Sequence, residues 1–194
     1  METYPCYSFQ PDDCEKYRLR YASAIYWPTE IPKADIVADV VFIGTAIPGR
    51  IEQLRKLRED FQIDGLQAMM HIVLPQHIQG DEEMAPDWCM TRHYASYETY
   101  LSWMARSRAI LELNQSEQTG FSQRTLEALF YVKKLITNNH TVMDADFYHP
   151  NNAFVLGHDD NLKAWMETPS TPVPEDVRDY YRVDNWARRI YENA

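Results

Sequence analysis

Residues 118–139 read QTGFSQRTLEALFYVKKLITNN, and they carry the clearest structural signal in the chain. A Thr-Gly turn leads to Ser122, a residue type that commonly caps helices, and apolar residues at helical spacing follow over 122–131. The run KLIT at 134–137 is typical of a short strand, and so is AILELN at 109–114. The stretch therefore predicts a strand, a loop, a helix and a second strand.

The same alternation extends towards both ends of the chain. VVFIG at 40–44 is a continuous apolar run that ends at glycine, as in a strand buried on both faces of a parallel sheet. A helix with Pro48 in its first turn follows, and a second apolar run occupies 66–74. A helix capped by Ser96 and a short strand at 153–157 continue the pattern. We therefore expect a single α/β domain, Rossmann-like, with about six mostly parallel strands and helices on both faces.

The two ends of the chain are rich in aromatic residues. We expect residues 1–38 to form an arm or linker, residues 39–174 to form the Rossmann-like domain, and residues 175–194 to contribute one amphipathic helix that packs on it. The aromatic rings suit either the domain's own core or a surface that packs against another domain or subunit. Residues 75–92 are rich in proline, glycine and acids, which predicts a surface excursion with a short edge element near 91–94.

Composition narrows the classes of partner. The net charge of −10 and the pI near 5.0 disfavour nucleic acid and anionic membrane surfaces, which need a clustered basic face. The three cysteines show no C-x-x-C spacing, so neither a disulfide framework nor a structural zinc site is expected. With no signal peptide and no apolar run of about 18 residues, we expect no transmembrane segment. The expected location is cytoplasmic, or peripheral to the inner membrane.

The loop before the 122–131 helix has the properties of an anion site. We call Thr119, Gly120, Phe121 and Ser122 the 119–122 turn. Its glycine permits close backbone approach, its serine adds a hydroxyl, and the first amides of a helix have no partners within the helix. The alternative is that Ser122 merely caps the helix.

Arg124 and Glu127 lie outside the apolar stripe of the same helix, three residues apart. Their functional interpretation gives the arginine to a phosphate and the glutamate to the hydroxyl groups of a sugar. The alternative is a solvated ion pair that contributes about 0.2–0.5 kcal/mol. Elsewhere, Asp144-Ala145-Asp146 has the form of a D-x-D motif, but aspartate is common enough here for one chance occurrence, so we assign it to a loop. The histidines lack metal-ligand spacing, and no metal or cofactor is expected.

Four stretches together resemble a known family. They are QTGFSQRTLEALFYVKKLITNN, DADFYHPNNAFVL (144–156), YSFQPDD (7–13) and DVVFIGTAIPGR (39–50). The chain resembles the C-terminal, donor-nucleotide-binding domain of bacterial GT-B-type glycosyltransferases of lipopolysaccharide and capsule biosynthesis. The resemblance implies a nucleotide-sugar as donor substrate, with the loop and helix start near its diphosphate and a helix glutamate on its ribose. Donor contacts would fall on Thr119, Gly120, Ser122, Arg124 and Glu127.

The chain departs from that family in two ways. Val132 stands where such proteins often have glycine, and the loop after the first strand offers only Gly44, Gly49 and Arg50. The sequence also lacks the N-terminal domain that binds acceptor in a GT-B enzyme, so we expect no turnover without an acceptor-binding domain or subunit. Two hypotheses follow: a donor-binding part of a glycosyltransferase, or a non-catalytic interaction module that keeps the fold but not the ligand.

Overall fold

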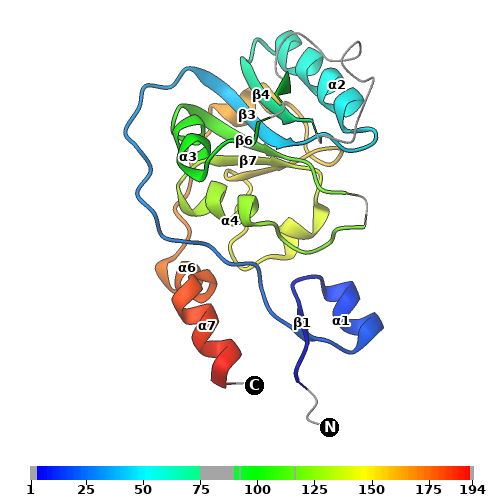
Figure 1. Ribbon diagram of the computed structural model, residues 1–194. Helices are drawn as coiled ribbons and strands as arrows, with labels where there is room; N and C mark the ends of the chain where they lie inside the picture. The colour runs from blue at the N-terminus through cyan, green and yellow to red at the C-terminus, as the bar shows by residue number, and fades with distance from the viewer. Residues whose placement is uncertain (1–3, 75–89, 92, 116, 193–194) are drawn as a thin grey trace. The chain divides into compact units, whose positions relative to one another are not determined.

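The computed structural model describes residues 4–74, 90–91, 93–115 and 117–192 (Figure 1). These residues form two compact units. The first unit combines residues up to Glu30 with Glu112–Asp160 and with the chain from Thr168 onward. The second unit combines Ile31–Leu111 with Asn161–Glu167. The domain limits expected at residues 38 and 174 remain a prediction. Among the described residues, no helix has both the length and the apolar character needed to cross a bilayer.

The second unit is built on parallel strands. Their order is β5-β4-β3-β6, and every pairing described is parallel; the bounds are Ala38–Thr45 for β3, Ala68–Val73 for β4, Met90–Thr91 for β5 and Ser107–Glu112 for β6. The apolar run at 40–44 forms β3, which has a partner on each side and is almost fully buried from Val40 to Phe42. β5 is the short edge strand expected near residue 91; the rest of the predicted surface segment at 75–92 lies outside the described residues.

Two helices connect these strands. They are α2 (Arg50–Ile63) and α3 (Tyr97–Ala105), and the oxygen of Ser96 caps α3 as predicted, accepting a hydrogen bond from the amide of Thr99 at 3.1 Å. The chain steps from β3 to β4 in one direction and reaches β6 on the other side of β3, so right-handed crossovers place α2 and α3 on opposite faces. The prediction that Pro48 lies in the first turn of this helix was wrong. Gly49 adopts a left-handed conformation with φ 78°, and α2 begins after it, at Arg50.

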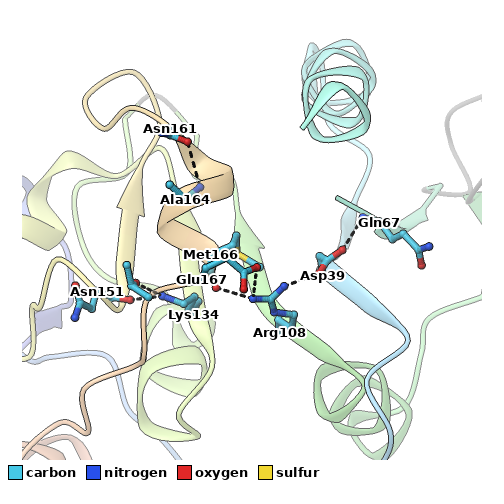
Figure 2. A network of polar contacts seen from close by, with 10 residues as sticks. Asp39, Gln67, Arg108, Lys134, Asn151, Asn161, Ala164, Met166 and Glu167 are labelled. Atoms are coloured by element: carbon cyan, nitrogen blue, oxygen red, sulfur yellow. Dashed lines mark hydrogen bonds and ion pairs between the residues drawn. The ribbon is translucent and has the colours of Figure 1, made fainter. Parts of the chain in front are cut away.

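A polar network closes the second unit around Arg108 (Figure 2). The guanidinium of Arg108 donates to Asp39 Oδ1 at 3.0 Å, to the carbonyl oxygen of Met166 at 2.7 Å and to Glu167 Oε1 at 2.9 Å. The other carboxylate oxygen of Asp39 accepts from the amide of Gln67 at 2.9 Å. Helix α5 (Leu162–Met166) is thereby attached to β6 and to the start of β3, although Met166 is 58 residues from Arg108 in the sequence.

The first unit contains the 118–139 stretch. Its strands β7 (Lys134–Thr137) and β8 (Ala153–Val155) pair in parallel, and α4 (Gln123–Phe130) packs on β7. A 3-10 helix, η2 (His140–Asp144), follows β7. The strand, loop, helix and strand expected from residues 109–137 are confirmed, with the first strand starting two residues earlier than expected. Together with the second unit, these six mostly parallel strands confirm the Rossmann-like α/β class.

Both ends of the chain differ in detail from the expectation. Short elements occur where no periodicity was visible: β1 (Tyr7–Ser8) pairs in parallel with β2 (Arg20–Tyr21), and α1 (Pro11–Tyr17) lies between them. The prediction of a single C-terminal helix was wrong, because this segment forms two helices, α6 (Glu175–Tyr181) and α7 (Val183–Glu192).

The backbone of Tyr26 accounts for the break between α6 and α7. Its N–H donates to the carbonyl oxygen of Tyr181 at 2.9 Å, and its carbonyl oxygen accepts from Val183 at 3.1 Å, so Arg182 is extended with ψ 138°. The rings of Tyr26 and Tyr181 are buried and pack against Phe130 with centroid distances of 4.9 and 5.8 Å. These two aromatic residues from the chain ends therefore belong to the core of the first unit.

Candidate functional site

The candidate site lies where β6 and β7 end. The amide of Asn114 donates to Asn138 Oδ1 at 2.8 Å, and Nδ2 of Asn138 donates back to the carbonyl oxygen of Asn114 at 3.0 Å. The chain segments that leave the two strands are thereby joined side by side. In parallel α/β sheets, ligands bind outside the carboxyl ends of the strands, so this is the correct end of the fold for a ligand.

A buried carboxylate holds the 119–122 turn to these strand ends. Glu112 is 1% exposed, and its Oε1 accepts hydrogen bonds from the hydroxyl of Ser122 and from Oγ1 of Thr125 at 2.7 Å. Its Oε2 accepts from Oγ1 of Thr137 at 2.9 Å. Three hydroxyl groups thus satisfy the carboxylate, which fixes the start of α4 against the end of β7.

Ser122 is fully engaged by this arrangement. Because its hydroxyl proton points to Glu112, its oxygen accepts from the amides of Arg124 and Thr125 at 3.1 and 3.4 Å. The serine therefore caps α4, which is the alternative that the sequence left open.

A side chain from the N-terminal segment covers the amides of the turn. The N–H groups of Thr119 and Gly120 both donate to Oε1 of Gln10, with N···O distances of 3.0 and 2.6 Å. The carbonyl oxygen of Thr119 accepts from Oγ1 of Thr141 at 2.8 Å. The two consecutive amides converge on one oxygen atom, which is the geometry that an anion-binding turn requires. Here that oxygen belongs to the chain itself.

Gly120 permits a close approach, and the group that approaches is Phe9. A Cβ atom at position 120 would lie 2.3 Å from the carbonyl oxygen of Phe9 and 2.8 Å from its ring atom Cδ2. Any larger residue would push the Phe9–Gln10 segment away. The glycine and Gln10 are therefore parts of one contact between the N-terminal segment and the turn.

Arg124 and Glu127 have different surroundings. Glu127 is 3% exposed, and Nε2 of Gln123 donates to its Oε1 at 3.0 Å. Arg124 is half-buried. The helix is buried along its whole length from Thr125 to Phe130, so Glu127 does not lie on a solvated face of α4.

Two cavities adjoin the turn. One, of about 380 Å³, is lined by Thr119 and Gly120 together with acidic and aromatic side chains. The other, of about 660 Å³, is lined by Ser122 and its neighbours in the sequence. Arg124 and Glu127 are not among the residues that line either cavity. Three of the five predicted residues thus line a cavity, and the other two, in α4, line neither of these cavities.

Asp146, from the D-x-D sequence, is held in the first unit by a tyrosine. The hydroxyl of Tyr181 donates to Asp146 Oδ1 at 2.8 Å, and burial together with this carboxylate raises the pKa of the tyrosine far above its ordinary value. Asp144 and Asp146 are both exposed. Within the described ranges, no group of three or more histidine, cysteine or acidic side chains could hold a metal ion.

Two residues that shape the candidate site were not expected from the sequence. Gln10 lies 109 residues from Thr119, and a lone glutamine in an irregular segment carries no local signal. Glu112 did have a signal, since it is the one charged residue in the apolar run AILELN. An acid in a buried strand needs partners, and the hydroxyl residues at 122, 125 and 137 are those partners.

Comparison with known proteins identifies the fold. No protein-family model and no curated protein sequence matches this chain. The crystal structure of AviGT4, a glycosyltransferase involved in avilamycin A biosynthesis, is similar with a TM-score of 0.60 at 14% sequence identity. The likeness covers 96% of this chain and 61% of that protein, so the chain spans about three fifths of its length. The chain therefore has a glycosyltransferase-like α/β fold.

Proposed function

We propose that this chain is the donor-binding part of a glycosyltransferase and that it binds a nucleotide-sugar at the 119–122 turn. The observation that carries the proposal is the convergence of the Thr119 and Gly120 amides on Oε1 of Gln10. A phosphate oxygen is a stronger acceptor than an amide oxygen for the same two N–H groups, since hydrogen bonds to charged acceptors are about twice as strong. The donor's diphosphate would replace Gln10 at this position.

The glycosyltransferase-like fold supports this proposal. The turn follows β6 and begins α4, at the end of the sheet where α/β proteins bind their ligands. The adjoining cavity of about 380 Å³ gives the sugar of the donor room beside Thr119 and Gly120, and cavities of this size are typical of small-molecule sites.

Arg124 and Glu127 complete the proposed site. Ser122 keeps its capping role, Arg124 pairs with a phosphate, and Glu127 accepts hydrogen bonds from the ribose hydroxyl groups. Because Glu127 is 3% exposed and bound by Gln123, its ribose contact requires Gln123 to turn away. We therefore expect Gln123 to respond to nucleotide together with Glu127.

The remaining parts of the proposal concern the acceptor. The resemblance of residues 7–13, 39–50, 118–139 and 144–156 to enzymes of lipopolysaccharide and capsule synthesis favours a surface-polysaccharide acceptor, handled in the cytoplasm or at the inner membrane. Since the chain spans about three fifths of AviGT4, we propose that an acceptor-binding domain or subunit acts with it. We expect no efficient turnover by these 194 residues alone.

Titration of the chain with UDP, GDP and ADP and their sugars tests the proposal, with NMR to locate the response. We expect saturable binding to one of them, with amide shifts at Thr119 and Gly120, and loss of binding in Glu127→Ala. Glu117→Ala, an exposed glutamate before the turn, is the matched control and should bind normally. The absence of any response to all three nucleotides would refute nucleotide-sugar binding.

A second function is favoured by the same contact. Because Gln10 already satisfies the amides of Thr119 and Gly120, the chain needs no ligand there. A non-catalytic interaction module would keep this closed arrangement permanently. It predicts no nucleotide response in the wild-type chain and none after Gln10 is removed.

A further inference from the structure

Two neighbouring cavities in the first unit are not lined by Thr119 or Gly120, whose amides bind Gln10. The apolar cavity, of about 660 Å³, is lined by residues 7–9, 22–25, 118, 121–123 and 186. The arginine cavity, of about 430 Å³, is lined by residues 20–23 and by side chains of α6 and α7. Both volumes are within the range of small-molecule sites. Four residues line both cavities, so the two are contiguous: Tyr7, Ala22, Ser23 and Trp186.

The apolar cavity offers few hydrogen bonds. Its walls are mostly aromatic and aliphatic, and several of its polar groups are already engaged within the chain. The hydroxyl of Ser122 donates to Glu112, Nε2 of Gln123 donates to Glu127, and Oγ of Ser8 accepts from the amide of Gln10 at 3.1 Å. A nucleobase needs partners for the polar groups on its edges, whereas a hydrocarbon chain needs none. The cavity therefore favours hydrocarbon.

The arginine cavity favours an anion. Arg20 and Arg189 both line it, in a chain whose net charge is −10. Each guanidinium is positioned by a tyrosine: Nη1 of Arg20 donates to the hydroxyl of Tyr7 at 3.3 Å, and Cζ of Arg189 lies 3.8 Å from the ring centroid of Tyr180. Two guanidinium groups at one cavity match the oxygens of a phosphate group better than those of any neutral head group.

Ser23 marks the junction between the two cavities. It is 5% exposed, it lines both of them, and its hydroxyl has no hydrogen-bond partner among the described residues. Its backbone is held, because Nε1 of Trp186 donates to its carbonyl oxygen at 2.9 Å. Buried hydroxyl groups in native proteins normally have a partner, so this one points to an oxygen supplied from outside the chain.

We propose that the two cavities together bind an amphiphile with a hydrocarbon chain and a phosphate head group. The chain occupies the apolar cavity, the phosphate lies between Arg20 and Arg189, and the ester oxygen accepts the hydrogen bond of Ser23. The proposal does not depend on nucleotide binding at the turn.

Calorimetric titration of the full chain with decyl phosphate, below its micelle concentration, tests this site. We expect one molecule bound per chain, and much weaker binding of inorganic phosphate and of decyl glucoside, which each carry half of the recognised chemistry. Arg20→Met and Arg189→Met should each weaken binding by about tenfold, the loss expected for a hydrogen bond to a charged group. Arg188→Met is the matched control, because Arg188 lies on α7, is exposed and lines neither cavity.

Two further variants keep the test decisive if an arginine variant fails to fold. Ser23→Ala should weaken binding several-fold while the melting temperature stays the same or rises, because the buried hydroxyl has no partner in the chain. Ala24→Leu narrows the apolar cavity alone and should weaken decyl phosphate more than inorganic phosphate. Equal affinities in Arg188→Met and Arg189→Met, or an unchanged affinity in Ser23→Ala, would overturn the assignment.

The head group could be presented by a dissolved lipid phosphate or by a membrane. Flotation with vesicles of neutral lipid, with and without 20% of an anionic phospholipid, separates these sources. Binding of monomeric decyl phosphate without vesicle binding identifies a dissolved ligand, and vesicle binding that Ala24→Leu abolishes identifies a membrane lipid. Vesicle binding that neither Ala24→Leu nor Arg189→Met changes, with no binding of monomeric decyl phosphate, contradicts the proposal.

Discussion

Substitution of Gln10 by alanine separates the two functions considered for the 119–122 turn. Oε1 of Gln10 accepts from the amides of Thr119 and Gly120 at 3.0 and 2.6 Å, so a donor phosphate that uses these amides must first displace it. The alanine variant removes the competing oxygen and leaves the amides in place. If the turn binds phosphate, the variant should bind the nucleotide more tightly than the wild type.

The size of the gain follows from the two hydrogen bonds. Each contributes a net free energy of about 0.5–1.5 kcal/mol, so displacing Gln10 costs about 1–3 kcal/mol. Removing that cost raises the affinity by a factor of about 5 to 150. The same loss should lower the free energy of unfolding of the ligand-free variant by about 1–3 kcal/mol. Affinity and stability therefore change in opposite directions, which a general weakening of the structure does not produce.

Calorimetry with the responding nucleoside diphosphate and urea unfolding measure the two quantities. Gln10→Glu supplies the opposite perturbation, because a carboxylate is a stronger acceptor and repels a phosphate, so it should lower the affinity. Gln62→Ala, at an exposed position of α2, controls for loss of a glutamine side chain. An affinity that stays unchanged or falls in Gln10→Ala would refute the idea that the ligand and Gln10 share these amides.

Three other predictions concern stability. Glu112→Gln should lower the free energy of unfolding by about 2–3 kcal/mol, because the amide nitrogen cannot accept a hydroxyl hydrogen bond that the carboxylate accepts in a buried site. Arg108→Met should lower it by about 1–2 kcal/mol, since the partly exposed guanidinium loses Asp39, Glu167 and a carbonyl partner. Burial lowers the pKa of His71 below its ordinary value of 6.5, so the unfolded chain takes up a proton that the folded chain resists. The melting temperature should therefore fall as the pH drops below about 6.5, and less so in His71→Phe.

Each of these has a control. Glu117→Gln changes an exposed glutamate and should leave urea unfolding unaltered. Arg55→Met removes an exposed pair with Glu52 and should alter stability by less than about 0.5 kcal/mol. For His71, the imidazole ring stacks on the ring of Trp103 with a centroid distance of 3.6 Å. The phenylalanine variant retains this stacking, so it removes only the titratable group. Identical pH profiles for the wild type and His71→Phe would mean that another group controls the loss of stability.

Local sequence was sufficient to predict the parts of the fold that local chemistry determines. The apolar run at 40–44 forms a buried central strand, and Ser96 and Ser122 cap helices, because an apolar run and a serine before a helix are signals contained in a few consecutive residues. The prediction of a single C-terminal helix was wrong because a residue far away in the sequence interrupts it. Its periodicity continues through Arg182, but the backbone of Tyr26 forms hydrogen bonds on both sides of that residue, and no local pattern encodes a partner more than 150 residues away.

The candidate site was also predictable only in the part that local sequence determines. The 119–122 turn was predictable because glycine, serine and a following helix are adjacent in the sequence, whereas its occupant was not, because Gln10 reaches it from the far N-terminus. Burial of Glu127 was also not predictable from spacing. Helical periodicity distinguishes an apolar stripe from the opposite face, but α4 is buried all along from Thr125, so its polar side chains also lie inside.

Two groups hold the turn, the carboxylate of Glu112 and the side-chain oxygen of Gln10, and a ligand would affect them differently. On its inner side, Glu112 fixes Ser122 and Thr125 through hydroxyl groups that no ligand replaces, so the turn keeps its shape whatever occupies it. On its outer side, the amides of Thr119 and Gly120 bind whichever oxygen competes best. At this turn, a permanent module and a donor site therefore share one scaffold and differ in whether a phosphate oxygen can displace Gln10. Removal of Gln10 measures the free energy of that competition.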